Sequence, residues 1–183
     1  AQGVEAGGHR GMFLVDDITR QAGTMALVPQ VVDAVKVPVI AAGGIGDGRG
    51  IAAALALGAA GVQMGTAFLL TPEARTPALH RAALKQAHDD STTLTNLFTG
   101  RPARAIVNRY IEEVGPMSVD APQFPLAAGA SGPLRAASEA RGSSDFMPLW
   151  SGQAPLLARE MPAGELIAAL TRETEAALRR AQG

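Results

Sequence analysis

Two pairs of small residues, Gly43-Gly44 and Gly65-Thr66, each follow a short apolar run with the composition of a buried strand. Glycine at a strand end leaves the backbone open to close approach and permits positive φ, so that amide N–H groups can turn toward an anion. The threonine hydroxyl adds another donor. Because neighbouring parallel strands end at the same edge of a sheet, we expect both turns to converge on one phosphate. Two tight turns without a ligand are the alternative interpretation.

His9 is the residue best suited to react beside such a phosphate. It follows Gly7 and Gly8 in a short loop, residues 5–9, that comes directly after residues 1–4, a segment with the pattern of a strand end. Barrel enzymes place catalytic groups at this end of their strands, and imidazole, with a reference pKa of about 6.5, serves as a base or as a cation near neutral pH. A loop histidine without a role is the competing interpretation.

The other titratable residues give weaker signals. We interpret His80 and His88 as solvated, and Asp16-Asp17 and Asp89-Asp90 as solvated turns rather than acid–base pairs. No histidine pair and no carboxylate cluster has metal-ligand spacing, so the sequence predicts no metal site. Arg101 and Arg104 are interpreted as a surface pair at a helix start. Trp150 suits either the core or a cover over the site.

The elements that must position these residues form a βαβ unit. Residues 37–42 and 61–64 are predicted to be parallel strands buried on both faces, and a helix capped by Asp47 joins them over residues 48–57, where Gly58 ends it. The helix that follows Thr24 is expected to begin near Val28, since Pro29 fits only a first turn. The remaining predictions are helices over 76–87, 103–112 and 162–181, a strand within 92–99, and a connecting or lid segment over 115–144.

Composition narrows the class. The chain has 183 residues, 47% of them apolar, and a formal charge of -1, which predicts a globular protein and gives no electrostatic case for nucleic acid as a partner. No apolar run is long enough to predict a membrane span. Cysteine is absent, which excludes disulfides and thiolate chemistry within the chain and fits a cytoplasmic location.

Several segments resemble one family. The string VPVIAAGGIGDGRGIAAALALGAAGVQMGTAFL resembles the phosphate-binding segment of the nitronate monooxygenases, and QGVEAGGHRG resembles their histidine motif. TNLFTGRPAR and PLWSGQ are similar to two further segments of the bacterial members. The first two motifs are also similar to the flavin-dependent enoyl-acyl-carrier-protein reductases, whereas the last two favour the monooxygenases.

The resemblance implies an α/β fold, namely the C-terminal half of a TIM-like (β/α)8 barrel over residues 1–114, with a lid segment and a C-terminal helix over residues 115–183. We expect the barrel's first half to be missing from this chain, because such barrels need about 200–250 residues. The resemblance also implies bound FMN and a catalytic His9. The implied cofactor-binding residues are Gln2, Gly7, Gly44, Gln63, Met64, Gly65 and Thr66, to which the backbone argument adds Gly43.

The implied reaction is the FMN-dependent oxidation of alkyl nitronates, or of nitroalkanes, by O2 to carbonyl compounds and nitrite. Two alternatives remain open. One is an FMN- and NAD(P)H-dependent enoyl-thioester reductase, and the other is a redox-inactive phosphate-binding fragment. Small molecules are the expected partners, and self-association into a homo-oligomer is a further expectation, since a partial barrel leaves sheet edges unpaired.

Overall fold

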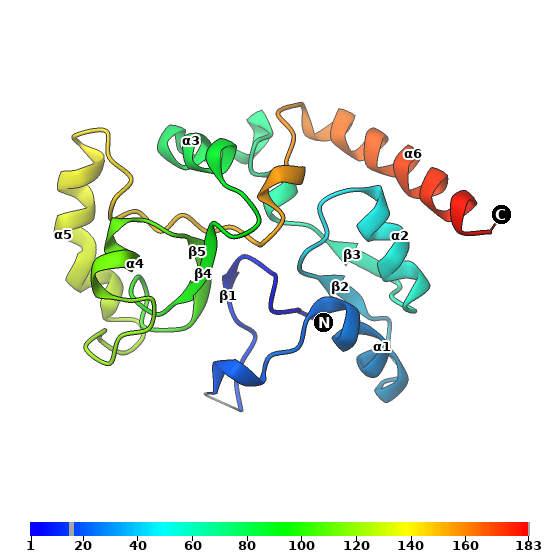
Figure 1. Cartoon of the computed structure of the whole chain (residues 1–183), viewed down its shortest axis with the longest axis horizontal. Coiled ribbons are helices and arrows are strands. Elements are labelled where there is room, and N and C mark those ends of the chain that lie inside the picture. Colours follow the sequence, from blue (N-terminus) through cyan, green and yellow to red (C-terminus); the bar gives the residue numbers. More distant parts are fainter. Residues whose placement is uncertain (15–16, 183) are drawn as a thin grey trace.

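Two small sheets and the helices around them make up the chain in a computed structural model that describes residues 1–14 and 17–182. Figure 1 shows β2 and β3 with α1 and α2 in one part, and β4 and β5 with α4 and α5 in the other. The strands are β1 (Gly8–His9), β2 (Ile40–Ala42), β3 (Gly61–Gln63), β4 (Thr92–Thr95) and β5 (Ala103–Ile106). The α-helices are α1 (Thr24–Ala34), α2 (Gly48–Ala56), α3 (Ala78–Gln86), α4 (Arg109–Val114), α5 (Ala127–Glu139) and α6 (Ala163–Gln182).

The predicted βαβ unit is present. Strands β2 and β3 are parallel, with Ala42 opposite Gln63, and α2 connects them. On the other side of β2, Gln2 forms an isolated parallel bridge with Ala42, as expected for a strand end. Asp47 caps α2 by accepting hydrogen bonds from the amides of its first turn, and Gly58, with φ of 92°, follows its end.

Burial of the two parallel strands is one-sided, so the prediction of burial on both faces is wrong. Ala41 is fully buried in a cluster with Val28 of α1 and Ala54 of α2, whereas Ile40 is 45% exposed. Successive side chains on a strand point to opposite faces. The two helices therefore cover one face, and the described residues leave the Ile40 side open.

A three-stranded antiparallel sheet, in the order β1-β5-β4, corrects the prediction of a helix over residues 103–112. His9 pairs with Ala103, and Thr92 pairs with Ile106. Ala103 is completely buried between these neighbours, so tertiary pairing outweighs its local preference for helix. The helix begins only after Asn108, whose side chain accepts a hydrogen bond from the Ile111 amide.

Two other predictions change. Helix α1 begins at Thr24 and contains Pro29. Proline removes one internal hydrogen bond, but the Thr24 amide donates to Glu5 and Val28 is buried in the core, so the helix continues through it. The segment over 115–144 is not all irregular: α5 forms within it, with an Arg135–Glu139 pair at 2.5 Å across one turn. Asp16 lies outside the described residues.

The long helix α6 packs on α2 through a close backbone approach. A Cβ at Gly48 would lie 2.3 Å from the Cβ of Glu173, so glycine is required there. The Glu173 carboxylate accepts from the Gly48 amide and from Arg159, at 3.2 and 2.6 Å. Among the residues that the structure describes, no helix is long and apolar enough to cross a membrane.

Candidate cofactor and active site

The turn after β2 has the backbone geometry that an anion cradle needs. Gly43 and Gly44 have φ of 115° and 68°, values that favour glycine. A Cβ at Gly43 would lie 2.8 Å from Thr24 Oγ1 and 3.1 Å from the Ala6 amide, so the turn is packed tightly on its protein side. Among the described residues, the amides of Gly44 and Ile45 donate to no protein acceptor, which leaves both available to a ligand.

The N-terminus of α2, by contrast, is already occupied. Asp47 Oδ1 accepts from the amides of Arg49 and Gly50 at 2.9 and 3.3 Å, and Glu173 accepts from Gly48. Its first-turn amides are therefore already paired within the protein, and a phosphate beside this helix would depend on donors from the turn itself.

The turn after β3 is built differently. Gly65 has an ordinary φ of -98°, so left-handed backbone is not the reason for glycine there. A Cβ on Gly65 would meet no atom within 4 Å, so the glycine keeps space open. Thr66 Oγ1 accepts from the Gly152 amide at 2.8 Å, which leaves the hydroxyl proton free to donate.

The two turns converge on one cavity of about 260 Å³. Trp150 and Gly152 close part of its wall. No cationic side chain lines it among the described residues, so an anion held there would rely on backbone amides and a hydroxyl. Seven of the predicted cofactor-binding residues line this cavity: Gln2, Gly7, Gly43, Gly44, Gln63, Gly65 and Thr66.

Met64 is the predicted cofactor residue that the structure does not bring to the cavity. Its side chain lines an apolar groove with Val62, Phe68 and residues of α6. Glycine at position 7 is also required by packing. A Cβ there would lie 2.6 Å from the Gly152 amide nitrogen, so glycine allows the loop before His9 to approach the loop after Trp150.

His9 lies beside this cavity rather than in its lining. It lines a neighbouring cavity of about 540 Å³ with Arg101, Phe13 and Phe124, and Gln2 lines both cavities. The Gln2 amide holds the histidine segment, because Nε2 donates to the His9 carbonyl at 3.0 Å and Oε1 accepts from the Gly11 amide at 2.7 Å. Gln2 thus joins the glycine cradle to the histidine.

The surroundings of His9 favour its neutral form. Burial, followed by the positive charge of Arg101, lowers its pKa below the ordinary 6.5. Its ring packs on Trp150 with centroids 5.4 Å apart, and Nε2 lies 2.9 Å from Thr99 Oγ1. A neutral imidazole at neutral pH is a competent proton acceptor.

Two buried arginines hold the loop between Gln2 and His9: Arg10, which the sequence analysis did not single out, and Arg104, which it placed on the surface. Arg10 donates to the carbonyls of Gly3, at 2.8 Å, and Ala6, and burial lowers its pKa to about 10. Arg104 on β5 donates to the Val4 carbonyl at 2.9 Å, so the prediction of a surface arginine is wrong.

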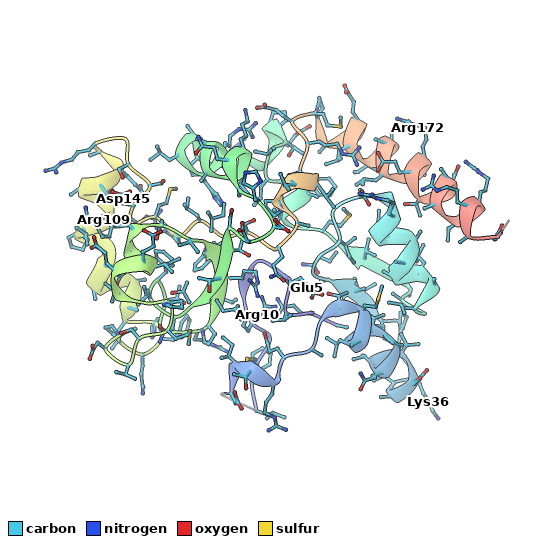
Figure 2. The ribbon with its side chains drawn as sticks, viewed as in Figure 1. Glu5, Arg10, Lys36, Arg109, Asp145 and Arg172 are labelled. Carbon is cyan, nitrogen blue, oxygen red and sulfur yellow. The ribbon has the colours of Figure 1, made fainter. Side chains whose placement is uncertain are left out.

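Glu5 is a third polar residue that the sequence analysis missed. Its carboxylate accepts from the Thr24 amide at 2.9 Å and from the Thr24 hydroxyl at 2.8 Å, at the positive end of α1. Figure 2 shows Glu5 and Arg10 near β1, in the middle of the molecule. The sequence gives no signal for this role of Glu5, since only its contact with Thr24 in the fold explains it.

His80 also departs from its prediction, because it is buried and not solvated. Its Nε2 lies 3.0 Å from the Trp150 carbonyl, so the ring ties α3 to the wall of the cavity that the two glycine turns line. Burial lowers the pKa of His80 below its ordinary 6.5. His88 is exposed, as predicted.

Stability is therefore expected to fall in acid because of His80. With its folded pKa below the ordinary value, the folded state binds this proton more weakly than the unfolded chain, so the contribution of the neutral ring is complete above pH 6.5 and decreases below it. Urea unfolding above and below this pH should show a smaller pH slope for His80→Gln than for the parent. His88→Gln is the matched control, and an unchanged slope in His80→Gln would contradict the assignment.

These features define an α/β protein in which two glycine turns share one cavity next to a histidine. Comparison with known proteins places it more narrowly: residues 1–173 match the family model "Nitronate monooxygenase". The chain belongs to the nitronate monooxygenase family.

Individual relatives agree with this placement. The chain is 47% identical over 174 residues to a "Nitronate monooxygenase" of Pseudomonas aeruginosa, which covers 94% of the chain and 50% of that protein. Among solved structures, nitroalkane oxidase from Streptomyces ansochromogenes is 43% identical with a TM-score of 0.88, covering 100% of this chain and 52% of that one. FabK from Thermotoga maritima is 30% identical with a TM-score of 0.75, covering 100% and 56%. The chain spans about half the length of the curated relatives it matches.

Proposed function

We propose that this chain supplies the phosphate cradle and the reacting histidine of an FMN-dependent enzyme that oxidises alkyl nitronates, or nitroalkanes, with O2 to carbonyl compounds and nitrite. One observation carries the proposal: the Gly43-Gly44 and Gly65-Thr66 turns converge on a single cavity that Gln2 connects to His9. Membership of the nitronate monooxygenase family supports the reaction class.

The residues present fit the phosphate end of FMN. The Gly44 and Ile45 amides lack protein acceptors among the described residues, and the space beside Gly65 would be filled by a Cβ. The cavity, at about 260 Å³, is smaller than the roughly 300–1,000 Å³ of complete ligand sites. We therefore infer that it holds the phosphate and adjoining chain, while the flavin ring lies outside it.

The chemistry divides between cofactor and protein. Bound FMN supplies the redox chemistry. His9, held neutral by burial and Arg101, accepts the α-proton of a neutral nitroalkane or donates a hydrogen bond to a nitronate. Trp150 packs on the His9 ring and also lines the phosphate cavity, so it fixes the position of His9 relative to that cavity.

We also propose that residues 1–114 form the C-terminal half of a TIM-like (β/α)8 barrel and that residues 115–183 form its lid segment and last helix. The parallel β2–α2–β3 unit beside Gln2 supports the barrel part. The antiparallel β1-β5-β4 sheet is an addition that a barrel does not predict. The division at residue 114 stays a prediction.

Replacing His9 by asparagine is expected to lower oxidation of a neutral nitroalkane by about 100-fold or more, the usual contribution of a general base. Oxygen uptake by the purified, flavin-loaded protein measures this. The acid limb of the parent's pH–rate profile should lie below pH 6.5, because the pKa of His9 is lowered. His88→Asn, at an exposed position, is the control, and parent-like turnover of His9→Asn would sink the assignment.

An NAD(P)H-dependent enoyl-thioester reductase is the second candidate, which the likeness to FabK keeps open. Anaerobic mixing with NADPH separates the two. Rapid bleaching of the flavin would favour the reductase, whereas a flavin that stays oxidised until a nitronate is added supports the monooxygenase. A protein that takes up no flavin at all would be the redox-inactive alternative.

A further inference from the structure

The loop between β4 and β5 brings Thr99 to the ring of His9. The residues are 90 positions apart, yet His9 Nε2 and Thr99 Oγ1 are 2.9 Å apart. Antiparallel pairing explains the approach, since His9 lies opposite Ala103 on β5 and the Arg10 amide donates to the Pro102 carbonyl at 3.0 Å. The contact is thus built on backbone hydrogen bonds.

The other contacts of the Thr99 hydroxyl define its direction. Oγ1 accepts from the Arg101 amide at 3.4 Å, and the Arg101 carbonyl, which can only accept a hydrogen bond, lies 3.3 Å from Oγ1. A hydroxyl has one proton and two acceptor lone pairs. All three contacts are satisfied together only when His9 Nε2 carries a hydrogen and donates it to Oγ1.

We propose that Thr99 is a positioning residue that holds His9 in the Nε2–H tautomer and so leaves Nδ1 as the nitrogen that accepts the substrate proton. The inference rests on the proposed function for its substrate. When a neutral nitroalkane reacts, its α-proton moves to Nδ1, the C–H electron pair becomes the carbon–nitrogen double bond of the nitronate, and the N=O π pair moves onto a nitro oxygen. His9 becomes an imidazolium that Nε2–H still anchors to Thr99.

The charges around His9 favour a neutral ring, in which a single nitrogen carries the proton. The charged side chains that line its cavity among the described residues are Arg10 and Arg101, both cations. Trp150 packs on the ring without a charge. Burial and Arg101 lower the pKa of His9, so the ring is neutral at neutral pH and one nitrogen alone is protonated.

Imidazole ¹⁵N NMR on the purified, flavin-loaded protein with labelled histidine tests this directly. The signal of His9 is assigned as the one that His9→Asn removes. We expect Nε2–H in the parent and in Thr99→Ser, and a mixture of tautomers in Thr99→Val, which keeps the shape and removes the hydroxyl. Predominant Nδ1–H in the parent overturns the proposal, and this result does not require the valine variant to fold.

Turnover provides the second measurement. Thr99→Val should oxidise a neutral nitroalkane about tenfold more slowly through kcat, while a preformed nitronate, which needs no proton removal, should be affected less. Thr99→Ser should restore the parent rate. Equal losses for both substrates, or no loss, overturn the positioning role. If the parent shows the expected tautomer but oxidises neither substrate, the proposed function fails while the Thr99–His9 arrangement stands.

Discussion

Replacing Gly65 by valine is expected to weaken FMN binding by roughly 100-fold without lowering thermal stability. Gly65 lines the proposed phosphate cavity, its φ suits any residue, and its Cβ would meet no protein atom within 4 Å. The added side chain would therefore enter the space of the ligand alone, where each charge-assisted hydrogen bond to a phosphate is worth about 1.5–3 kcal/mol. Flavin fluorescence titration and a thermal melt of the flavin-free protein measure the two effects.

Two other glycines serve as controls. Gly43→Ala should destabilise the fold itself by about 1–3 kcal/mol, because it combines φ of 115° with a Cβ 2.8 Å from Thr24 Oγ1. Gly164→Val, on α6, has the same open surroundings as Gly65 but does not line the cavity, so it should leave flavin binding unchanged. Parent-like affinity in Gly65→Val would contradict a ligand beside β3.

Replacing Arg10 by methionine is expected to cost about 3 kcal/mol of unfolding free energy. Methionine would leave the Ala6 carbonyl without the guanidinium donor and the Gly3 carbonyl with the Ala6 amide as a donor, at 3.2 Å. An unsatisfied buried acceptor costs about 1–3 kcal/mol. Burial of the guanidinium also has a cost, which its pKa of about 10 reflects. We expect the hydrogen bonds from Arg10 to contribute more than this burial cost, because they hold together the loop that carries both Glu5 and His9.

Urea unfolding compares this variant with Arg109→Met. Arg109 is exposed and pairs with Glu113 across one turn of α4, so its loss should change stability by less than about 0.5 kcal/mol. Figure 2 shows the two arginines in different settings, one near β1 and one at the periphery. Equal effects for both variants would show that the loop does not depend on Arg10.

The parts of the fold that the sequence predicted correctly depend on local signals. Asp47 and Gly58 mark the ends of α2, and the β-branched run before Gly43 marks β2. The errors arose where distant residues decide. Ala103 joins a strand because β1 and β4 pair with it, and α5 forms in a segment whose glycine and proline content predicts a loop.

The candidate site divides in the same way. Glycine turns and a histidine after two glycines are visible in the sequence, because backbone conformation restricts residue type. Thr99 and Glu5 are not, because they act on a ring and a helix end that are remote in the chain. Arg10 is not either, because its carbonyl partners, Gly3 and Ala6, are backbone groups that leave no mark in the sequence. His80 looked solvated because the periodicity of α3 does not show that Trp150 covers it.

The central claim is that the two glycine turns hold the phosphate of a flavin. The most direct measurement is a fluorescence titration of the purified, flavin-free protein with FMN and with riboflavin, which lacks the phosphate. We predict that FMN binds about 100-fold more tightly or better, since the amides of Gly44 and Ile45 donate to no acceptor among the described residues and the Thr66 hydroxyl keeps a proton to donate. Equal affinity for the two flavins would contradict the account.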